Sequence, residues 1–277
     1  MRVAIFGLLT VLASGPALGD VLDRVAQTGE IRLGVRGDAP PFSYLGEDGR
    51  HRGLAVAICE EVVVRIGRML DVAITPIQVA QTARTRFAAL VDGETDLHCG
   101  PATATLSRRE TIDFSILYFV DGATLAGRPD AYERVFEARE GRIGVLDGTT
   151  SVAVVEDLVA RNQISGGIER FPSHAAGLEA LERGALDLYA GDQAILLFFL
   201  AQLFPDADLA VQEEVLSFEP YALAMKRGES ALRLAVDRAL SALYADGTIH
   251  ALIKTALGDF PLPPEAEAAY EIVGLPE

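Results

Sequence analysis

Residues 141–151, GRIGVLDGTTS, decide the fold class of this 277-residue chain. The stretch begins with apolar residues, turns at Asp-Gly and continues into Thr-Thr-Ser, which predicts a strand, a tight turn and the start of a helix. The same succession recurs on both sides. IRLGV (31–35) predicts a strand and GLAVAICEEVVVRIGRML (53–70) a helix, while HAAGLEALERG (174–184) predicts a helix before the strand ALDLYAGD (185–192). Alternating strands and helices predict an α/β protein with a parallel sheet.

The composition narrows the class of function. The chain has 24 basic and 40 acidic residues, a formal net charge of −16, and half of its residues are hydrophobic. This acidic balance argues against binding of nucleic acid or of an anionic membrane surface. Residues 1–19 have the pattern of a cleaved secretory signal peptide, with one arginine, an apolar run and small residues before Asp20. The alternative for this segment is a buried helix or a membrane anchor.

The sequence contains two cysteines, Cys59 and Cys99. In an exported protein such a pair suggests a disulfide, and the alternative is two small buried apolar side chains. Their spacing matches neither a redox motif nor a zinc site, and the sequence has no phosphate-binding P-loop, GxGxxG, HExxH or GxSxG motif. We therefore expect no cofactor, no metal and no enzymatic activity.

Polar residues at the ends of predicted strands form the candidate site. These are Arg36, Thr103, Arg108, Thr150, His174 and Asp192. In a parallel sheet, strand ends and helix starts share one rim, where α/β proteins bind ligands. Each residue alone is a weak signal, because a loop arginine is commonly a solvated charge, a histidine at a helix start is commonly at the surface, and a threonine or aspartate before a helix is commonly its N-cap. Arg36 stands out because it places a permanent positive charge in the loop VRGDAPPFSY (35–44) of an acidic chain.

Three segments in this order, TATLSRRETIDFS (103–115), GTTS (148–151) and GALDLYAGD (184–192), resemble a known family. They are similar to the bacterial periplasmic solute-binding proteins of polar amino-acid ABC importers (family 3), and the likeness covers about residues 22–258. Within that family the chain looks most like the glutamate/aspartate-binding type. That type shares the arginine of the first loop, the Cys-Gly pair at 99–100 and the histidine before the second-lobe acid.

The resemblance implies a type II periplasmic-binding-protein fold, an α/β fold in which two lobes enclose a ligand cleft. Two crossing strands, at about 118–126 and 220–226, would join the lobes. The expected divisions are a signal peptide at 1–19, the first part of lobe one at 20–121, lobe two at 122–219, the second part of lobe one at 220–260 and a C-terminal tail at 261–277. The tail is expected along the surface or loose. The resemblance also implies that Cys59 and Cys99 are joined.

The resemblance assigns the groups common to all amino acids to four residues. Arg108, with the hydroxyls of Thr103 and Thr150, would hold the α-carboxylate, because a planar guanidinium and nearby hydroxyls suit that anion. Asp192 would hold the α-ammonium group.

The ligand's side chain is assigned to Arg36, Arg86 and His174. Three arginines against one aspartate give the cleft a local charge near +2, which favours an acidic side chain and repels a basic one. Pro101 and Ala102 stand where relatives often have serine or threonine, which leaves glutamine, asparagine or another small dicarboxylate open as ligands.

The resemblance implies extracytoplasmic binding of a polar amino acid, glutamate or aspartate first. A periplasmic monomer would deliver this ligand to the permease subunits of an ABC importer. One alternative is an enzyme like cyclohexadienyl (arogenate or prephenate) dehydratase on the same scaffold, in which His174 and Asp192 would transfer protons. The other is a sensory binding module.

Overall fold

The structure, a computed structural model, describes residues 21–258, 270 and 273–276. The signal peptide predicted for residues 1–19 lies outside the described residues. Within the described part of the chain, no helix combines the length and the apolar character needed to cross a bilayer.

One large sheet forms the centre of the described residues. Its strands in spatial order are β5 (Thr75–Gln81), β1 (Glu30–Arg36), β6 (Leu97–Cys99), β12 (Ser217–Lys226), β7 (Ile112–Gly127), β10 (Leu188–Asp192), β8 (Ile143–Leu146) and β9 (Ile168–Phe171), with β11 (Ala210–Val211) paired to β7. The parallel pairing predicted from the sequence is confirmed on both flanks, where β1 pairs with β5 and β6, and β8 pairs with β9 and β10. Between the flanks, β7 and β12 run antiparallel to each other, which the alternating pattern did not predict.

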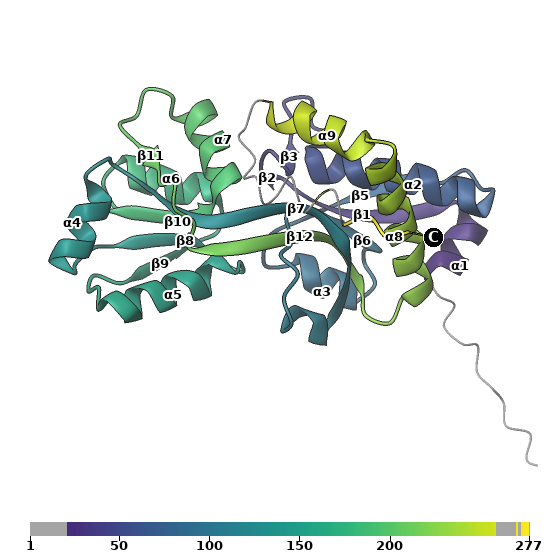
Figure 1. Cartoon of the computed structure of the whole chain (residues 1–277), viewed down its shortest axis with the longest axis horizontal. Helices are drawn as coiled ribbons and strands as arrows, with labels where there is room; N and C mark the ends of the chain where they lie inside the picture. Colours follow the sequence, from purple (N-terminus) through teal and green to yellow (C-terminus); the bar gives the residue numbers. More distant parts are fainter. Residues whose placement is uncertain (1–20, 259–269, 271–272, 277) are drawn as a thin grey trace, which may run out of the picture.

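The helices divide into two groups, one on each flank of the sheet (Figure 1). Around β1, β5 and β6 lie α1 (Val21–Thr28), α2 (Leu54–Leu70), α3 (Arg86–Val91), the short 3₁₀ helix η1 (Arg108–Glu110), α8 (Ser230–Ala245) and α9 (Thr248–Leu257). Around β8, β9 and β10 lie α4 (Ala131–Ala138), α5 (Ser151–Asn162), α6 (His174–Glu182) and α7 (Gln193–Leu203). In Figure 1, β7 and β12 run along the long axis from one group to the other.

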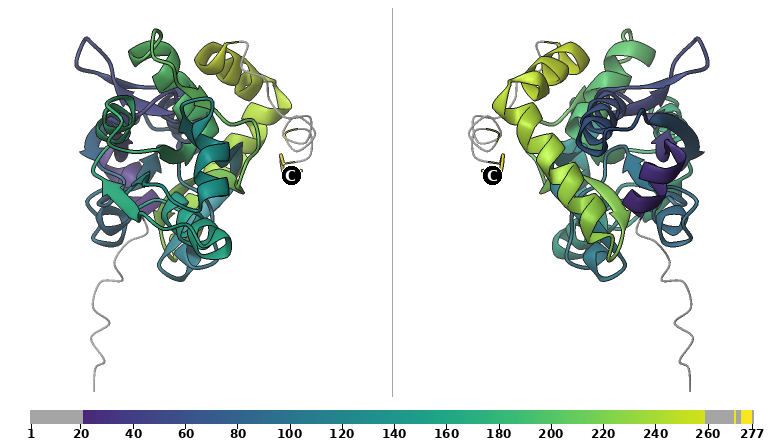
Figure 2. Two further views of the ribbon diagram at one scale, coloured as in Figure 1. Left: turned by 90° about the vertical axis from the view of Figure 1, so that its left-hand side faces the viewer. Right: turned by 90° about the vertical axis from the view of Figure 1, so that its right-hand side faces the viewer.

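The end view in the right-hand panel of Figure 2 shows how the first group is closed. Helix α8 crosses that end of the molecule and packs against α1, α2 and α9. Helix α2 contributes a continuous apolar face to this packing, with Ile58, Val62 and Ile66 fully buried. These are positions that recur at helical spacing in the sequence, so the burial follows the predicted periodicity.

A small sheet of β2 (Asp38–Ala39), β3 (Ser43–Leu45) and β4 (His51–Arg52) carries the loop after β1. The loop is attached to the start of α2, because the backbone N–H groups of Leu54 and Ala55 donate to the carbonyl oxygens of Pro41 and Phe42 at 2.9 Å each. Gly53 makes this approach possible: its φ is +122°, and a Cβ there would lie 2.5 Å from the Phe42 backbone. The loop that positions Arg36 is therefore held to a helix terminus.

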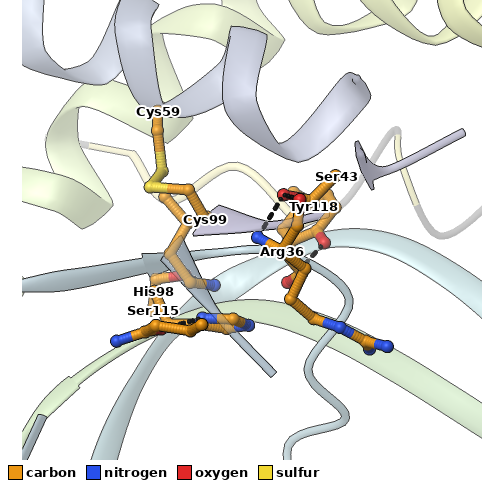
Figure 3. Close-up of a disulfide and its surroundings, with 10 residues drawn as sticks. Arg36, Ser43, Cys59, His98, Cys99, Ser115 and Tyr118 are labelled. Atoms are coloured by element: carbon orange, nitrogen blue, oxygen red, sulfur yellow. Dashed lines mark hydrogen bonds between the residues drawn. A yellow bond between two sulfur atoms is a disulfide. The ribbon is translucent and has the colours of Figure 1, made fainter. Parts of the chain in front are cut away.

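Cys59 of α2 and Cys99 of β6 form a disulfide, which confirms the pairing implied by the resemblance (Figure 3). The two Cα atoms are 6.0 Å apart and the residues are separated by 40 positions. Closing a loop of that length contributes about 4 kcal/mol in the chain-entropy model. Successive strand residues point to opposite faces, so in Figure 3 Cys99 points toward α2 while the ring of His98 points away from it. The crosslink thus fixes the strand end that carries His98.

The expectation that the C-terminal tail lies along the surface or is loose is wrong for one residue. Tyr270 is 2% exposed, and its ring lies 6.3 Å from that of Phe119 and 6.4 Å from that of Tyr244. Its hydroxyl accepts a hydrogen bond from the backbone N–H of Val120 at 3.1 Å. This residue therefore packs against the middle of β7.

Candidate ligand-binding site

The seven residues predicted to bind a ligand lie at strand ends, in a loop or at helix starts on both sides of β7 and β12. They are Arg36 at the end of β1, Arg86 at the start of α3, Thr103 after β6, Arg108 at the start of η1, Thr150 before α5, His174 at the start of α6 and Asp192 at the end of β10. The structure brings them into one region, called the central site below. Two contacts join its sides: the hydroxyl oxygens of Thr103 and Thr150 are 3.5 Å apart, and Nη2 of Arg86 donates to the carbonyl oxygen of Gly148 at 3.3 Å. That these residues bind a ligand stays a prediction.

A pocket of about 350 Å³ borders the central site beside the contact between Arg86 and Gly148. Its lining comes from both sides and comprises Thr82, Ala83, Arg84, Asp147, Arg170, Phe171 and Pro172. An exposed ion pair crosses it, with Nη1 of Arg84 3.4 Å from Oδ2 of Asp147.

Arg36 is 2% exposed, so it is not a solvated loop charge. Its backbone N–H donates to Oγ of Ser43 at 2.9 Å, a bond drawn in Figure 3, and its Nε donates to Oδ1 of Asp38 at 2.9 Å. Nη2 is also buried, and it has no hydrogen-bond partner among the described residues. A buried donor without an acceptor is costly, so an acceptor at this position would stabilise the site.

Arg86, like Arg36, is a buried arginine. It is 2% exposed, donates to the carbonyl oxygen of Ala83 and lies 4.4 Å from the centre of the Phe87 ring. Its Nε is buried and has no partner within the described part of the chain. Burial, then the positive charges of Arg36 and Arg108, hold the pKa of Arg86 well below its ordinary value. The guanidinium group of Arg86 is therefore close enough to those of Arg36 and Arg108 to be repelled by each, and a bound anion would relieve that repulsion.

His174 is buried, with 3% exposure, so the surface alternative for this residue is wrong. Its Nδ1 lies 3.2 Å from the hydroxyl of Tyr189, which fixes the orientation of the ring. Burial and the nearby Arg36 lower the pKa of His174 to about 3. The ring is neutral at physiological pH, and it can offer a hydrogen bond but not a charge.

Thr150 and Asp192 occupy the N-cap positions of α5 and α7, but neither side chain makes a capping hydrogen bond. The Thr150 hydroxyl instead donates to Glu219 at 2.7 Å. The carboxylate of Asp192 accepts hydrogen bonds from the hydroxyls of Tyr221 and, at 3.4 Å, Ser151. Burial and the negative charge of Glu219 raise the pKa of Asp192 to about 6. Both residues therefore face the central site.

Two buried acids on the long strands were missed by the sequence reasoning. Glu219 of β12 is 2% exposed and Asp121 of β7 is 8% exposed, and the two residues pair across the strands. Burial, then the charge of Asp192, raises the pKa of Asp121 well above its ordinary value. The signal for Glu219 was its two-residue spacing from Tyr221 and Leu223 on a strand, which places all three on one face.

His98 and Gln81 were also missed. His98 is fully buried, with Nδ1 3.1 Å from Oε1 of Gln81, and Nε2 of Gln81 donates to the Thr95 hydroxyl at 3.0 Å. Burial, then the positive charge of Arg86, keeps the pKa of His98 well below its ordinary value. Its Nε2 has no partner among the residues described. A neutral imidazole nitrogen therefore lies near the guanidinium groups.

The local charge near +2 expected from the sequence is corrected by the structure. Arg36 keeps the pKa of Asp38 below its usual value, although burial opposes this effect. The site then holds three arginines, Arg36, Arg86 and Arg108, against four carboxyl groups, namely Asp38, Asp121, Asp192 and Glu219. Selectivity for a charged ligand must therefore come from where the charges lie and not from their sum. Within the described residues, no group of three or more His, Cys, Asp or Glu side chains is arranged to hold a metal ion.

Comparison with known families matches residues 31–259 to the bacterial extracellular solute-binding proteins, family 3. The chain belongs to this family. The solute-binding protein is 27% identical over 265 residues to the L-glutamate/L-aspartate-binding protein of Pseudomonas aeruginosa, covering 93% of this chain and 87% of that relative. It is 28% identical over 235 residues to the glutamate/glutamine/aspartate/asparagine-binding protein BztA of Rhodobacter capsulatus, covering 83% and 68%.

Among solved structures, an ancestral arginine-binding protein bound to arginine superimposes on this solute-binding protein with a TM-score of 0.75. The two are 24% identical, and the match covers 83% of this chain and 99% of that one. This likeness shows the fold alone. It confirms the type II periplasmic-binding-protein fold, with β7 and β12 as the two strands that join its lobes.

Proposed function

We propose that this solute-binding protein binds a polar amino acid, with an acidic one preferred, and delivers it to the permease of an ABC importer. The observation that carries the proposal is a pair of buried cations, Arg36 and Arg86, whose Nη2 and Nε atoms respectively have no hydrogen-bond partner among the described residues. A carboxylate placed between such groups would be desolvated and doubly hydrogen-bonded, the geometry that makes charge-assisted bonds strong. The name of the Pseudomonas aeruginosa relative, which specifies glutamate and aspartate, supports the same choice, and the name of BztA includes both acids together with their amides.

The remaining residues supply the groups that every amino acid needs. Arg108, Thr103 and Thr150 would hold the α-carboxylate, and Asp192 the α-ammonium. Arg36 and Arg86 would hold the side-chain carboxylate, with a neutral hydrogen bond from His174. The assignment puts positive donors at both ends of the ligand and one negative acceptor between them, which complements the charge pattern of an acidic amino acid.

The family supports the biological setting of this proposal. We place the protein in the periplasm as a monomer, with lobe one at 20–121 and 220–260 and lobe two at 122–219. Thr103 and Arg108 then come from lobe one, and Thr150 and Asp192 from lobe two. A ligand held by both lobes would favour the closed arrangement, since only that arrangement makes all the contacts.

Isothermal calorimetry against the twenty amino acids and common dicarboxylates tests the proposed function. We expect L-glutamate or L-aspartate to bind most tightly, their amides more weakly, and lysine and arginine not measurably. A basic amino acid as the tightest ligand would reject the acidic assignment. Binding of a non-amino-acid solute alone would reject the whole proposal.

Binding should weaken as the pH falls through about 6. Asp192 holds the ammonium as a carboxylate, and burial together with Glu219 raises the pKa of Asp192 to about 6. Above that pH its attraction is fully present; below it a proton competes with the ligand, and the Kd should rise by up to about tenfold per pH unit. The ligand's own carboxylates stay ionised down to a pH of about 5. His174, with a pKa of about 3, does not titrate in this range.

Calorimetry of L-glutamate binding between pH 7.5 and 5 measures this effect. Asp192→Asn is the control variant, because it should bind weakly with a flat pH profile. A wild-type affinity that stays constant over this range would mean that no ionised Asp192 contacts the ammonium.

A further inference from the structure

Glu219 has an environment that its place on a linking strand does not explain. It lies near the start of β12, is 2% exposed and pairs with Asp121 of β7. A buried carboxylate is stable only if its oxygens are hydrogen-bonded or face a cation. The hydrogen-bond partners of Glu219 therefore indicate which chemical group this part of the site can bind.

Three hydroxyls hold the carboxylate. Oε2 accepts hydrogen bonds from Thr150 at 2.7 Å and from Thr103, and Oε1 accepts one from Ser217 at 2.7 Å. Thr103 follows β6 and Thr150 precedes α5, so one oxygen atom joins the two sides of the central site. A hydroxyl has a single proton to donate. While both threonines donate to Glu219, neither can donate to a second carboxylate.

Arg108 is a cation whose pKa the negative charge of Glu219 affects. Its Nη1 donates to the carbonyl oxygen of Thr103 at 2.8 Å, which holds the side chain beside the same threonine. Burial lowers the pKa of Arg108, and the negative charge of Glu219 is the largest opposing influence. Thr103 and Thr150 thus bind the Glu219 carboxylate in the way expected for the α-carboxylate of an amino acid, with Arg108 held beside Thr103.

We propose that Glu219 occupies the α-carboxylate subsite of the ligand-free protein, and that an amino acid must displace it in order to bind. This inference rests on the proposed function, because it takes the assignment of Arg108, Thr103 and Thr150 from there. The side chain acts as an internal competitor. The apparent affinity is the intrinsic affinity reduced by the fraction of molecules in which the subsite is free. Glu219 is therefore a residue that sets the affinity of the protein for its ligand.

Glu219→Gln tests the displacement. The amide keeps the shape and one acceptor oxygen but loses the charge that Arg108 attracts, so the subsite should be free more often. We expect L-glutamate to bind the variant about tenfold more tightly than wild type, as for a competitor that fills roughly nine-tenths of the sites. Ser217→Ala, which removes one hydrogen bond that holds Glu219, should shift the affinity in the same direction by a smaller factor. Thermal melting checks that both variants are folded.

Two controls separate displacement from general effects of charge. Glu213→Gln makes the same change in net charge at an exposed position before β12 and should leave the Kd unchanged. The α-amide of glutamate lacks the α-carboxylate and should bind Glu219→Gln no more tightly than it binds wild type. Equal tightening for glutamate and its α-amide would overturn the proposal, because the effect would not be specific to this subsite.

The outcomes also distinguish this proposal from the proposed function. If wild type binds glutamate and Glu219→Gln binds it equally or more weakly, the displacement model is wrong while the function stands; weaker binding would mean that Glu219 is itself a ligand contact. If neither protein binds any amino acid, the proposed function fails and the displacement model fails with it. Tightening in Glu219→Gln, and not in Glu213→Gln, supports both.

Discussion

Replacing Arg108 with alanine should abolish measurable binding of every amino acid. The guanidinium is the proposed partner of the α-carboxylate, which all amino acids share, and it is held in place by the Thr103 carbonyl at 2.8 Å and by the Phe87 ring 4.9 Å from its centre. Removing one member of a desolvated, hydrogen-bonded charge pair costs about 2–5 kcal/mol. That corresponds to a Kd roughly 30- to 5,000-fold higher. Calorimetry with glutamate, aspartate and glutamine would measure the loss.

The next residue provides a matched control. Arg109 lies in the same η1 turn and carries the same charge, but it is exposed and faces the Phe114 ring. Arg109→Ala should bind like wild type. Arg108→Lys, which keeps the charge without the planar fork of donors, should lie between wild type and alanine. Arg108→Ala with wild-type affinity would show that the α-carboxylate binds elsewhere.

The sequence predicted the outer parts of the fold well because they follow local rules. Alternating strand and helix patterns placed β1, α2, β8, α6 and β10, and the parallel pairing of the flanks followed from that alternation. The antiparallel pairing of β7 with β12 joins segments about one hundred residues apart. No local pattern encodes such a pairing, and only the family resemblance indicated the crossing strands. Tyr270 was missed for the same reason, because its burial depends on contacts with distant residues.

Residues of the central site were identified in the sequence where a residue type matched a motif and missed where it did not, and their binding of a ligand stays a prediction. Arg36, Thr150 and Asp192 stand in recognisable segments at strand or helix ends, and all three reach the central site. Glu219 and Asp121 lie inside strands, where an acid reads as a solvent-facing position. Their burial depends on the threonine, tyrosine and backbone donors that tertiary packing brings to them. Hence the charge of the site was counted too high, and the competition for Arg108 could not be seen in the sequence.

Arg36 should determine which amino acid binds and not whether an amino acid binds. Its side chain is buried with Nη2 unpaired among the described residues, while Nε is already bonded to Asp38. Arg36→Ala should weaken the binding of glutamate and aspartate by about 2 kcal/mol or more, which is the cost of losing a desolvated charge partner. That is a Kd roughly 30-fold higher. Glutamine presents a neutral amide to the same position, so its binding affinity should fall much less.

Arg36→Asp should change the ligand preference further than Arg36→Ala does. With Asp38 beside it, a second carboxylate would make this end of the site negative, and a repulsive element for a basic side chain would become an attractive one. Calorimetric affinities for glutamate, aspartate, glutamine and arginine on wild type, Arg36→Ala and Arg36→Asp measure the switch. Arginine should bind measurably to Arg36→Asp alone.

Arg84→Ala is the matched control for this series. Arg84 is a nearby arginine whose side chain is 73% exposed and pairs with Asp147 across the pocket that borders the central site. Its removal therefore changes the net charge by the same amount as Arg36→Ala without altering the central site. It should leave the order of ligands unchanged. Equal losses for glutamate and glutamine in Arg36→Ala would mean that Arg36 only holds its loop to Ser43 and Asp38. No loss for either ligand would remove the main physical support for an acidic ligand, because Nη2 would then face no part of it.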